Sequence, residues 1–530
     1  MLRRTTDNRA ADSRGARREG AKAVYDSGVG RALRRHWPFG ILLAAGLVLR
    51  VCAAAAYRPA LVYIDTVRYL GGDSHGLDPL GYSYLLLRPV LLLGGGLAGV
   101  AAVQHVLGLA MGVALYAVAI RYGAPNLLAC LAAAPVLLDA YQVQAEQMIM
   151  PDVLFEALIV AALVLLLWAP VPGPGRLAAA AALLGMSATV RQVGELLIVP
   201  LLGYVLAAAG GWRSRATGVV TAVALFALPV AGYMTLSATA LGNGFRLSNM
   251  DDAYLYGRVA HAADCGALRI PGYERPLCPS PAMARSLGVD GLATDPASPV
   301  FRYEPPPGIR RASAVAQFDE AVLTQQPLRV AGGIAADAIK LFALTRNTAQ
   351  GDTPVSRWQF QLAYPVYRAA DHAVLSAQPR VTRPLAVALR AYQLHGGYTP
   401  GPLLLAFFFS GTAAAFSLRR HRALALGCLL ATGLAVAAVF GADLYEFSWR
   451  YQLPVLVTLP VAGALGATVA GRNLVTWRSG SQGRMIRCIL TRLTRRSGQS
   501  QAALSTPTPG SGSAGTTSSA ATGPGERTPS

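Results

Sequence analysis

Residues 63–89 combine ionisable and aromatic side chains in a way that a simple connection between two apolar segments does not need. The sequence is YIDTVRYLGGDSHGLDPLGYSYLLLRP, and it contains Asp65, Arg68, Tyr69 and Tyr82. It directly follows an apolar segment that is long enough to cross a bilayer. Charged groups at a membrane boundary are costly and are usually functional. We therefore expect this segment to form part of a site.

Further acids and arginines lie at the ends of other apolar segments. They fall in three short stretches, EQMIMPD, TVRQVGE and EFSWRYQ, which follow or precede predicted membrane spans. Ionisable groups that converge from separate connections are typical of a functional cavity. The candidates in these stretches are Glu146, Asp152, Arg191, Glu195, Glu446, Arg450 and Tyr451.

These residue types fit the transfer of a sugar from a lipid phosphate. A carboxylate can take the proton of an acceptor hydroxyl as that hydroxyl attacks the sugar, and we assign this role to Asp65. The departing phosphate needs positive charge, which arginine supplies through a planar fork of donors. We assign that role to Arg191 and Arg450. We place Arg68, Tyr69, Tyr82, Glu146, Asp152, Glu195 and Tyr451 in the surrounding cavity.

The composition is that of a membrane protein. Of 530 residues, 53% are hydrophobic and only 14% are charged, and the mean hydropathy is +0.40. Soluble domains carry about a quarter charged residues. The net charge of +20 comes from arginines at the two termini and between apolar segments, which indicates contact with anionic lipid and not with nucleic acid. The six cysteines form no CxxC or Cys/His cluster with metal-ligand spacing, which argues against structural zinc. No cofactor is certain, and a divalent metal is possible but not assigned.

Length and hydropathy predict an all-α protein with about ten membrane spans and a large extracytoplasmic region. Each predicted span is a run of apolar residues bounded by polar or glycine-rich connections. The runs are 38–57, 97–120, 126–141, 151–168, 176–190, 194–209, 216–236, 401–418, 423–442 and 453–470.

The positions of the arginines predict the orientation. With the amino terminus inside, four of the five cytoplasmic connections carry positive charge close to a span, as the positive-inside rule requires. Both termini are then cytoplasmic, and the connections that hold the candidate residues face the outside of a cell membrane. The partners that this predicts are membrane lipid, a polyprenyl-phosphate sugar donor and an extracytoplasmic acceptor.

The same pattern divides the chain into five parts. A basic amino-terminal tail and a low-complexity carboxy-terminal tail, both expected to be disordered, flank two groups of spans that are separated by a long polar interval. The parts are 1–36, 37–236 with the first external loop at 58–80, 237–400, 401–471 and 472–530. Within the polar interval, Cys265 and Cys278 could form a disulfide on the oxidising side of the membrane, and two free thiols are the alternative.

The chain resembles the GT-C glycosyltransferases, in particular the phospholipid-carrier-dependent branch of the protein mannosyltransferases and aminoarabinose transferases. The resemblance covers roughly residues 35–471 and rests on the order of several weak motifs. They are YIDTVRYL, PLGYSYLLLRPVLLL, QHVLGLAMGVALYAVAIRYG, EQMIMPDVLFEAL, TVRQVGELLIVP and WRYQLPVLVTLP.

The resemblance implies an inverting transferase with Asp65 at the catalytic centre and Asp152 as a second acid in the cavity. Many relatives carry paired acids in the first external loop, whereas here Thr66 follows Asp65. This departure leaves the use of a divalent metal unassigned. Residues 237–400 match no acceptor-binding domain that we recognise, so the sugar and the acceptor (a glycan, a lipid or a protein) stay open.

Other interpretations stay open at this stage. Asp65 could be a solvated loop acid, Glu146 and Asp152 could cap a helix, and Arg191 could be a boundary arginine whose head group reaches the interface. The protein could also be a lipid or polysaccharide transporter or flippase, which predicts charged pairs inside the spans. A non-catalytic membrane scaffold would tolerate the loss of all three main candidates.

Overall fold

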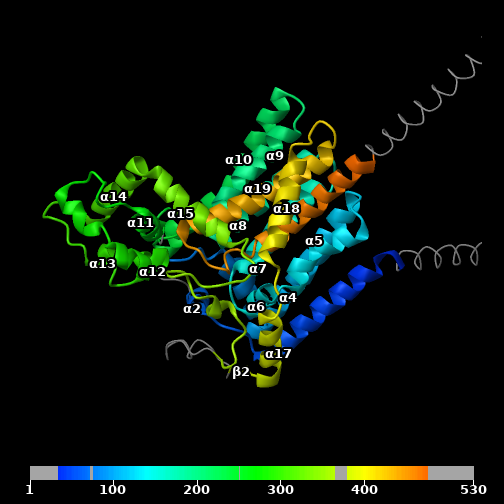
Figure 1. The fold of residues 1–530 in the computed structure, drawn as a ribbon, viewed down its shortest axis with the longest axis horizontal. Coiled ribbons are helices and arrows are strands. Elements are labelled where there is room, and N and C mark those ends of the chain that lie inside the picture. The colour runs from blue at the N-terminus through cyan, green and yellow to red at the C-terminus, as the bar shows by residue number, and fades with distance from the viewer. Residues whose placement is uncertain (1–33, 72–75, 250, 365–378, 476–530) are drawn as a thin grey trace, which may run out of the picture. The chain divides into compact units, whose positions relative to one another are not determined.

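The computed structural model describes residues 34–71, 76–249, 251–364 and 379–475 (Figure 1). Most of the two predicted terminal tails lies outside these residues. The chain divides into two compact units, Met1–Ala470 and Gly471–Ser530, and the site described below belongs to the first.

The described chain is almost entirely helical, with one short two-stranded antiparallel ladder between β1 and β2. Helices η1 and η3 are π-helices, and η2, η4 and η5 are 3-10 helices. In chain order the elements are the helix Arg34–Ala56, β1 (Tyr57–Arg58), α2 (Ile64–Gly71), η1 (Ser83–Leu87), α3 (Arg88–Leu92), α4 (Gly96–Arg121), α5 (Asn126–Leu138), α6 (Ala140–Gln147), α7 (Asp152–Leu167), α8 (Pro174–Val190), η2 (Gln192–Leu197), α9 (Ile198–Ala208), α10 (Trp212–Leu236), η3 (Ser237–Leu241), α11 (Asp251–Ala262), η4 (Gly272–Leu277), α12 (Pro281–Thr294), α13 (Pro299–Arg302), α14 (Arg311–Gln325), α15 (Pro327–Lys340), η5 (Val355–Trp358), β2 (Arg380–Val381), α17 (Arg383–Leu394), α18 (Gly401–Ala415), α19 (Arg422–Tyr445) and the helix Val455–Val475.

All ten segments that hydropathy predicts as spans are helical in the described chain. Five of the helices are long and apolar enough to cross a membrane alone: Arg34–Ala56, α4, α10 with η3, α19 and Val455–Val475. The pair α5 and α6, which is bent by 46°, would make a sixth. The other predicted spans, α7, α8, η2 with α9, and α18, are shorter apolar helices. An apolar run in the sequence therefore does not always give one uninterrupted membrane-length helix.

Polar residues mark the ends of two of the apolar helices, α5 and α8. Asp139 separates α5 from α6, and its carboxylate accepts a hydrogen bond from the backbone N–H of Tyr141 at 3.0 Å. It also pairs with Arg346 at 3.0 Å. Arg191 separates α8 from η2 with extended backbone angles, φ −144° and ψ 126°. Both breaks leave a polar side chain at the end of an apolar helix.

The interval between α10 and α18 contains a helical insertion with its own hydrophobic core. Tyr256 of α11, Leu292 of α12, Phe318 of α14 and Ile334 of α15 are all buried in this core. In Figure 1, α11 to α14 form a group apart from the long apolar helices. The insertion thus has a core of its own, and it contacts the membrane helices along α19, where Leu444 packs against this core.

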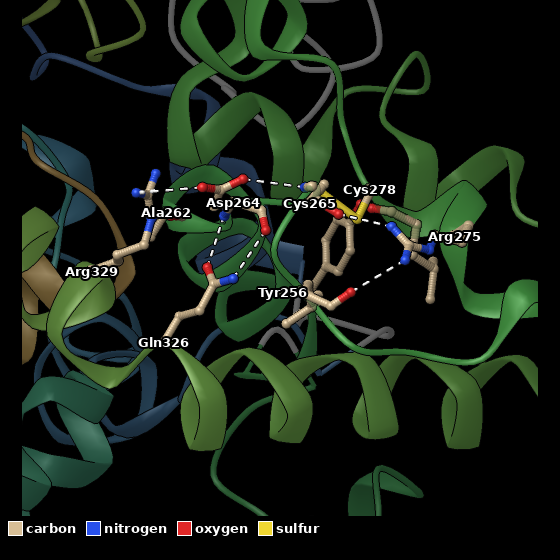
Figure 2. The surroundings of a disulfide bond; sticks show 11 residues. Tyr256, Ala262, Asp264, Cys265, Arg275, Cys278, Gln326 and Arg329 are labelled. Carbon is tan, nitrogen blue, oxygen red and sulfur yellow. Dashed lines mark hydrogen bonds and ion pairs between the residues drawn. A yellow bond between two sulfur atoms is a disulfide. The ribbon is translucent and has the colours of Figure 1, made fainter.

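A disulfide between Cys265 and Cys278 joins two parts of this insertion (Figure 2). Beside it, the guanidinium of Arg275 donates hydrogen bonds to the backbone carbonyls of Cys265 at 2.8 Å and Leu268 at 3.3 Å. The carboxamide of Gln326, between α14 and α15, bonds both the backbone N–H and the carbonyl of Asp264. The disulfide and these bonds fix the turn that follows α11.

Replacing Cys265 and Cys278 with serine will lower the free energy of unfolding of the insertion by about 3 kcal/mol, because the disulfide closes a loop across a separation of 13 residues. Thermal unfolding and limited proteolysis of the purified protein measure the effect. The matched control is serine at Cys52 and Cys130, which are free. Equal loss of stability in both variants would show that the disulfide does not stabilise the insertion.

Candidate active site

A cavity of about 400 Å³ lies where the ends of several helices meet the insertion. Its walls come from four parts of the chain: α2 with the segment that precedes it, the break between α8 and η2, the insertion, and the segment that follows α19. The charged and hydrogen-bonding residues that line it include Tyr63, Asp65, Arg68, Tyr69, Asp78, Arg191, Tyr254, Asp290, Thr353, Arg357, Glu446, Arg450 and Tyr451.

Asp65 lies in the first turn of α2, where a carboxylate interacts favourably with the helix dipole. One turn later, Arg68 donates a hydrogen bond from Nη2 to Asp65 Oδ1 at 2.6 Å. The Nε of Arg68 lies 2.6 Å from Asp78 Oδ2. Arg68 is thus held between two carboxylates and fixes the orientation of Asp65 toward the cavity.

Arg450 connects two acids that are far apart in the sequence. Its Nη1 lies 3.3 Å from Asp65 Oδ2, and its Nε lies 3.5 Å from Asp152 Oδ1. Arg191 also pairs with Asp152 through Nη1. Asp152 itself is only 2% exposed and lies behind the two arginines. One buried carboxylate therefore holds both guanidinium groups.

The ring of Tyr451 contacts the guanidinium groups of the same two arginines. The guanidinium carbon of Arg191 lies 4.6 Å from the ring centroid, and that of Arg450 lies 4.7 Å away. Arg450 also lies 4.9 Å from the centroid of the Trp358 ring. Guanidinium groups over aromatic faces are stabilised by the ring quadrupole. The two cations are thus positioned before any ligand binds.

Tyr254 and Asp290 of the insertion and Arg357 of η5 add further polar side chains to the cavity. The Tyr254 hydroxyl donates to Asp290 Oδ1 at 3.4 Å, and Arg357 Nη1 donates to the Tyr63 hydroxyl at 3.2 Å. Asp290, Tyr254 and Arg357 were not predicted as site residues. No local motif marks Asp290, which lies in α12 within the long polar interval. Only the tertiary fold brings these residues to Asp65.

Three predicted residues lie elsewhere. The Tyr82 hydroxyl donates to Gln104 Oε1 at 2.8 Å inside the helical core, and its ring stands edge-on to Tyr69. Glu195 lies on η2 and is exposed. Glu146 is fully buried and pairs with Arg50. None of the three lines the cavity that the described residues form, and neither does Asp152, which is buried beside it. Asp65, Arg68, Tyr69, Arg191, Arg450 and Tyr451 all line it.

No group of three or more histidine, cysteine or acidic side chains is arranged to hold a metal ion within the described part of the chain. The acids of the cavity are instead paired with arginines or hydrogen-bonded to hydroxyl groups. Asp65 and Asp152 share Arg450, and Glu446 Oε2 accepts a hydrogen bond from Thr353 Oγ1 at 3.2 Å. The cavity thus places fixed arginines beside two kinds of acid, those paired with an arginine and those hydrogen-bonded to a hydroxyl group.

Burial, together with the neighbouring Asp290, raises the pKa of Glu446 to about 8, and Arg450 opposes this shift. Burial also raises the pKa of Asp290, against the opposing effect of Arg357. Both acids therefore bind protons more tightly in the folded protein than in the unfolded chain. Glu446, which directly follows α19, therefore loses its negative charge as the pH falls through about 8.

Replacing Glu446 with glutamine will flatten the dependence of stability on pH. A carboxyl whose pKa is raised by folding contributes stability below its unfolded pKa near 4.5, and that contribution is lost as the pH rises through about 8. We expect the wild-type melting temperature to fall more steeply than that of Glu446→Gln between these pH values. Melting curves of both proteins in one detergent test this, and parallel curves would contradict it.

The sequence matches no protein-family model, and no curated protein matches it in sequence. Among solved structures, it is similar to the archaeal oligosaccharyltransferase AglB from Archaeoglobus fulgidus in complex with an inhibitory peptide and a dolichol-phosphate (12% identity, TM-score 0.38), covering 85% of this chain and 52% of that one. The chain therefore spans about half the length of AglB. It is also similar to ArnT from Cupriavidus metallidurans bound to undecaprenyl phosphate (16% identity, TM-score 0.32), with 83% and 80% covered. At these TM-scores we draw no argument about residues or activity from the likeness.

Proposed function

We propose that this chain is an integral membrane glycosyltransferase that moves a sugar from a polyprenyl-phosphate donor to an extracytoplasmic acceptor, with inversion at the anomeric carbon. The observation that carries the proposal is the pair Arg191 and Arg450. Both lie against Tyr451, both pair with Asp152, and both line the cavity that contains Asp65. The positive-inside pattern of the sequence supports an external position for this cavity.

The two arginines suit a phosphate monoester or diester better than a sugar alone. Each guanidinium has five N–H donors, and the contacts with Asp65 and Asp152 use only some of them. Donors that are already oriented stabilise charge that develops on a leaving group without further rearrangement. The donor phosphate would therefore bind Arg191 and Arg450 while its polyprenyl chain stays in the bilayer.

Binding of the donor also changes the surroundings of Asp65. Before binding, one of its oxygens accepts from Arg68 at 2.6 Å and the other lies 3.3 Å from Arg450. A phosphate that takes up Arg450 would compete for the longer contact and release Asp65 Oδ2. That oxygen would then be available to an acceptor hydroxyl. The donor must therefore bind before the acceptor.

The reaction is a single displacement. The acceptor oxygen forms a bond to the anomeric carbon from the face opposite the phosphate, and its proton passes to Asp65. The bond between the anomeric carbon and the phosphate oxygen breaks, and polyprenyl phosphate leaves with its negative charge on Arg191 and Arg450. Attack from the opposite face inverts the configuration. The insertion, through Tyr254, Asp290 and Arg357, would form the acceptor side of the cavity.

A donor panel tests the proposal. Membranes that contain the protein are supplied with labelled sugars on polyprenyl phosphates, with nucleotide sugars as the control. The account predicts that label leaves the lipid only when the lipid-linked donor is offered and the protein is present. Movement of intact labelled lipid across the bilayer, with no cleavage of the sugar–phosphate bond, would favour a flippase instead.

A further inference from the structure

A second cavity of about 650 Å³ lies between the helix Arg34–Ala56 and α4, and it shares no lining residue with the first. Exposed apolar side chains from the two helices form most of its surface. On the first helix they recur at intervals of four and three residues, and on α4 at intervals of four, so each set lies on one helix face. They are Leu47, Val51 and Ala54 on the first helix and Ala98, Ala102 and Val106 on α4.

One end of this groove carries two arginines whose placement is unfavourable in the absence of an anion. Arg58 and Arg380 also line the groove, and they are direct partners across the antiparallel ladder of β1 and β2. Like charges in directly opposite positions destabilise a strand pair. Both side chains are exposed, and neither makes an ion pair or a side-chain hydrogen bond within the described part of the chain. An anion shared by the two guanidiniums would turn this repulsion into attraction.

We propose that the groove binds one anionic phospholipid, with its phosphate on Arg58 and Arg380 and an acyl chain between the two helices. The segment of α4 from Ala98 to Leu109 is about 16 Å long at ~1.5 Å per residue, which matches about half of a bilayer core. The groove therefore has the depth of one leaflet. Arginine is well suited to phosphate because its planar fork can donate two bonds at once.

This lipid is distinct from the proposed sugar donor. The donor phosphate has to reach Arg191 and Arg450, which line the other cavity. The two cavities share no lining residue, and Leu61, in the segment between Arg58 of the groove and Tyr63 of the first cavity, is buried. Gln147, which lines the groove, donates from Nε2 to the Tyr57 carbonyl at 2.8 Å. We therefore assign the groove to a bilayer phospholipid that holds the first span against α4, and the assignment does not depend on the transferase activity.

Lipid retention after purification tests the proposal. The full chain is reconstituted in nanodiscs of equimolar phosphatidylcholine and phosphatidylglycerol, extracted in detergent, and analysed by native mass spectrometry. Wild type is expected to retain one phosphatidylglycerol. Arg58→Gln with Arg380→Gln is expected to lower the preference for phosphatidylglycerol about 25-fold, because each arginine at a lipid surface contributes about fivefold.

Two controls make the result specific. Arg269→Gln with Arg310→Gln removes the same charge from exposed positions of the insertion and should leave the preference unchanged. Ala102→Trp fills the groove, leaves both arginines in place and should abolish retention. Equal preference in the Arg58/Arg380 variant and wild type would overturn the proposal. Retention of polyprenyl phosphate over phosphatidylglycerol, when both are offered, would also overturn it.

Discussion

Replacing Arg450 with glutamine will reduce sugar transfer about 100-fold or more. Loss of one oriented donor to a developing charge typically has an effect of this size. Arg450 contacts Asp65 and Asp152 and stacks on Tyr451 and Trp358, so its guanidinium serves both the leaving group and the geometry of the base. Initial rates at saturating donor measure the effect. Lysine at this position keeps the charge but not the planar fork, and we expect it to restore only a small part of the rate.

The loss of sugar transfer in Arg450→Gln has to be separated from a folding defect, because Arg450 also helps to neutralise buried Asp152. The double variant Arg450→Gln with Asp152→Asn removes, along with the arginine, the charge of a carboxylate that would otherwise keep only Arg191 as its partner. We expect it to recover thermal stability and to stay inactive. Arg302→Gln, at an exposed position of the insertion, is the matched charge control. A double variant that is stable and active would show that Arg450 has no role in transfer.

Replacing Glu146 with alanine will destabilise the protein by about 3–5 kcal/mol, the usual cost of breaking a buried ion pair. Glu146 is fully buried, and its carboxylate lies 2.6 Å from Arg50 Nη2 and 3.0 Å from His105 Nδ1. The substitution leaves Arg50 charged and without its partner in the helical core. Gly108 faces the same carboxylate so closely that a Cβ there would lie 2.0 Å from Glu146 Oε1.

Thermal or denaturant unfolding in detergent measures this destabilisation, with Glu320→Ala at an exposed position of α14 as the control for loss of an acid. A double replacement of Arg50 and Glu146 by leucine should be much less harmful than Glu146→Ala, because no unpaired charge remains. If Glu146→Ala unfolds like wild type but loses transfer, Glu146 belongs to the site and not to the helical core.

All ten apolar runs that hydropathy predicts as spans are helical, because burial in a bilayer requires a long apolar sequence. Hydropathy did not predict where α5 and α6 bend. That bend depends on Asp139, whose carboxylate caps α6 and pairs with Arg346 from the distant insertion. The uninterrupted length of a helix thus depends on tertiary partners that hydropathy does not contain.

The residues at the cavity also divide into those that the local sequence marks and those that depend on tertiary contacts. Asp65, Arg191 and Arg450 could be predicted because each is a charged residue at the end of an apolar run, where charge is unexpected. Glu146 has the same local appearance but is buried against Arg50 of the first helix, a pairing that depends on how the helices pack. Asp290 lacked even a local signal, because it lies in a polar interval where charge is ordinary.

The most direct test of the account compares wild type with Asp65→Asn in the transfer of labelled sugar from polyprenyl phosphate, at equal amounts of folded protein. Asparagine keeps the shape of the side chain and removes the base. The account predicts transfer by wild type, loss of transfer in the variant of about 100-fold or more, and retained binding of the donor lipid. Equal transfer by the two proteins would contradict it, and would show that Asp65 is a structural partner of Arg68 and Arg450.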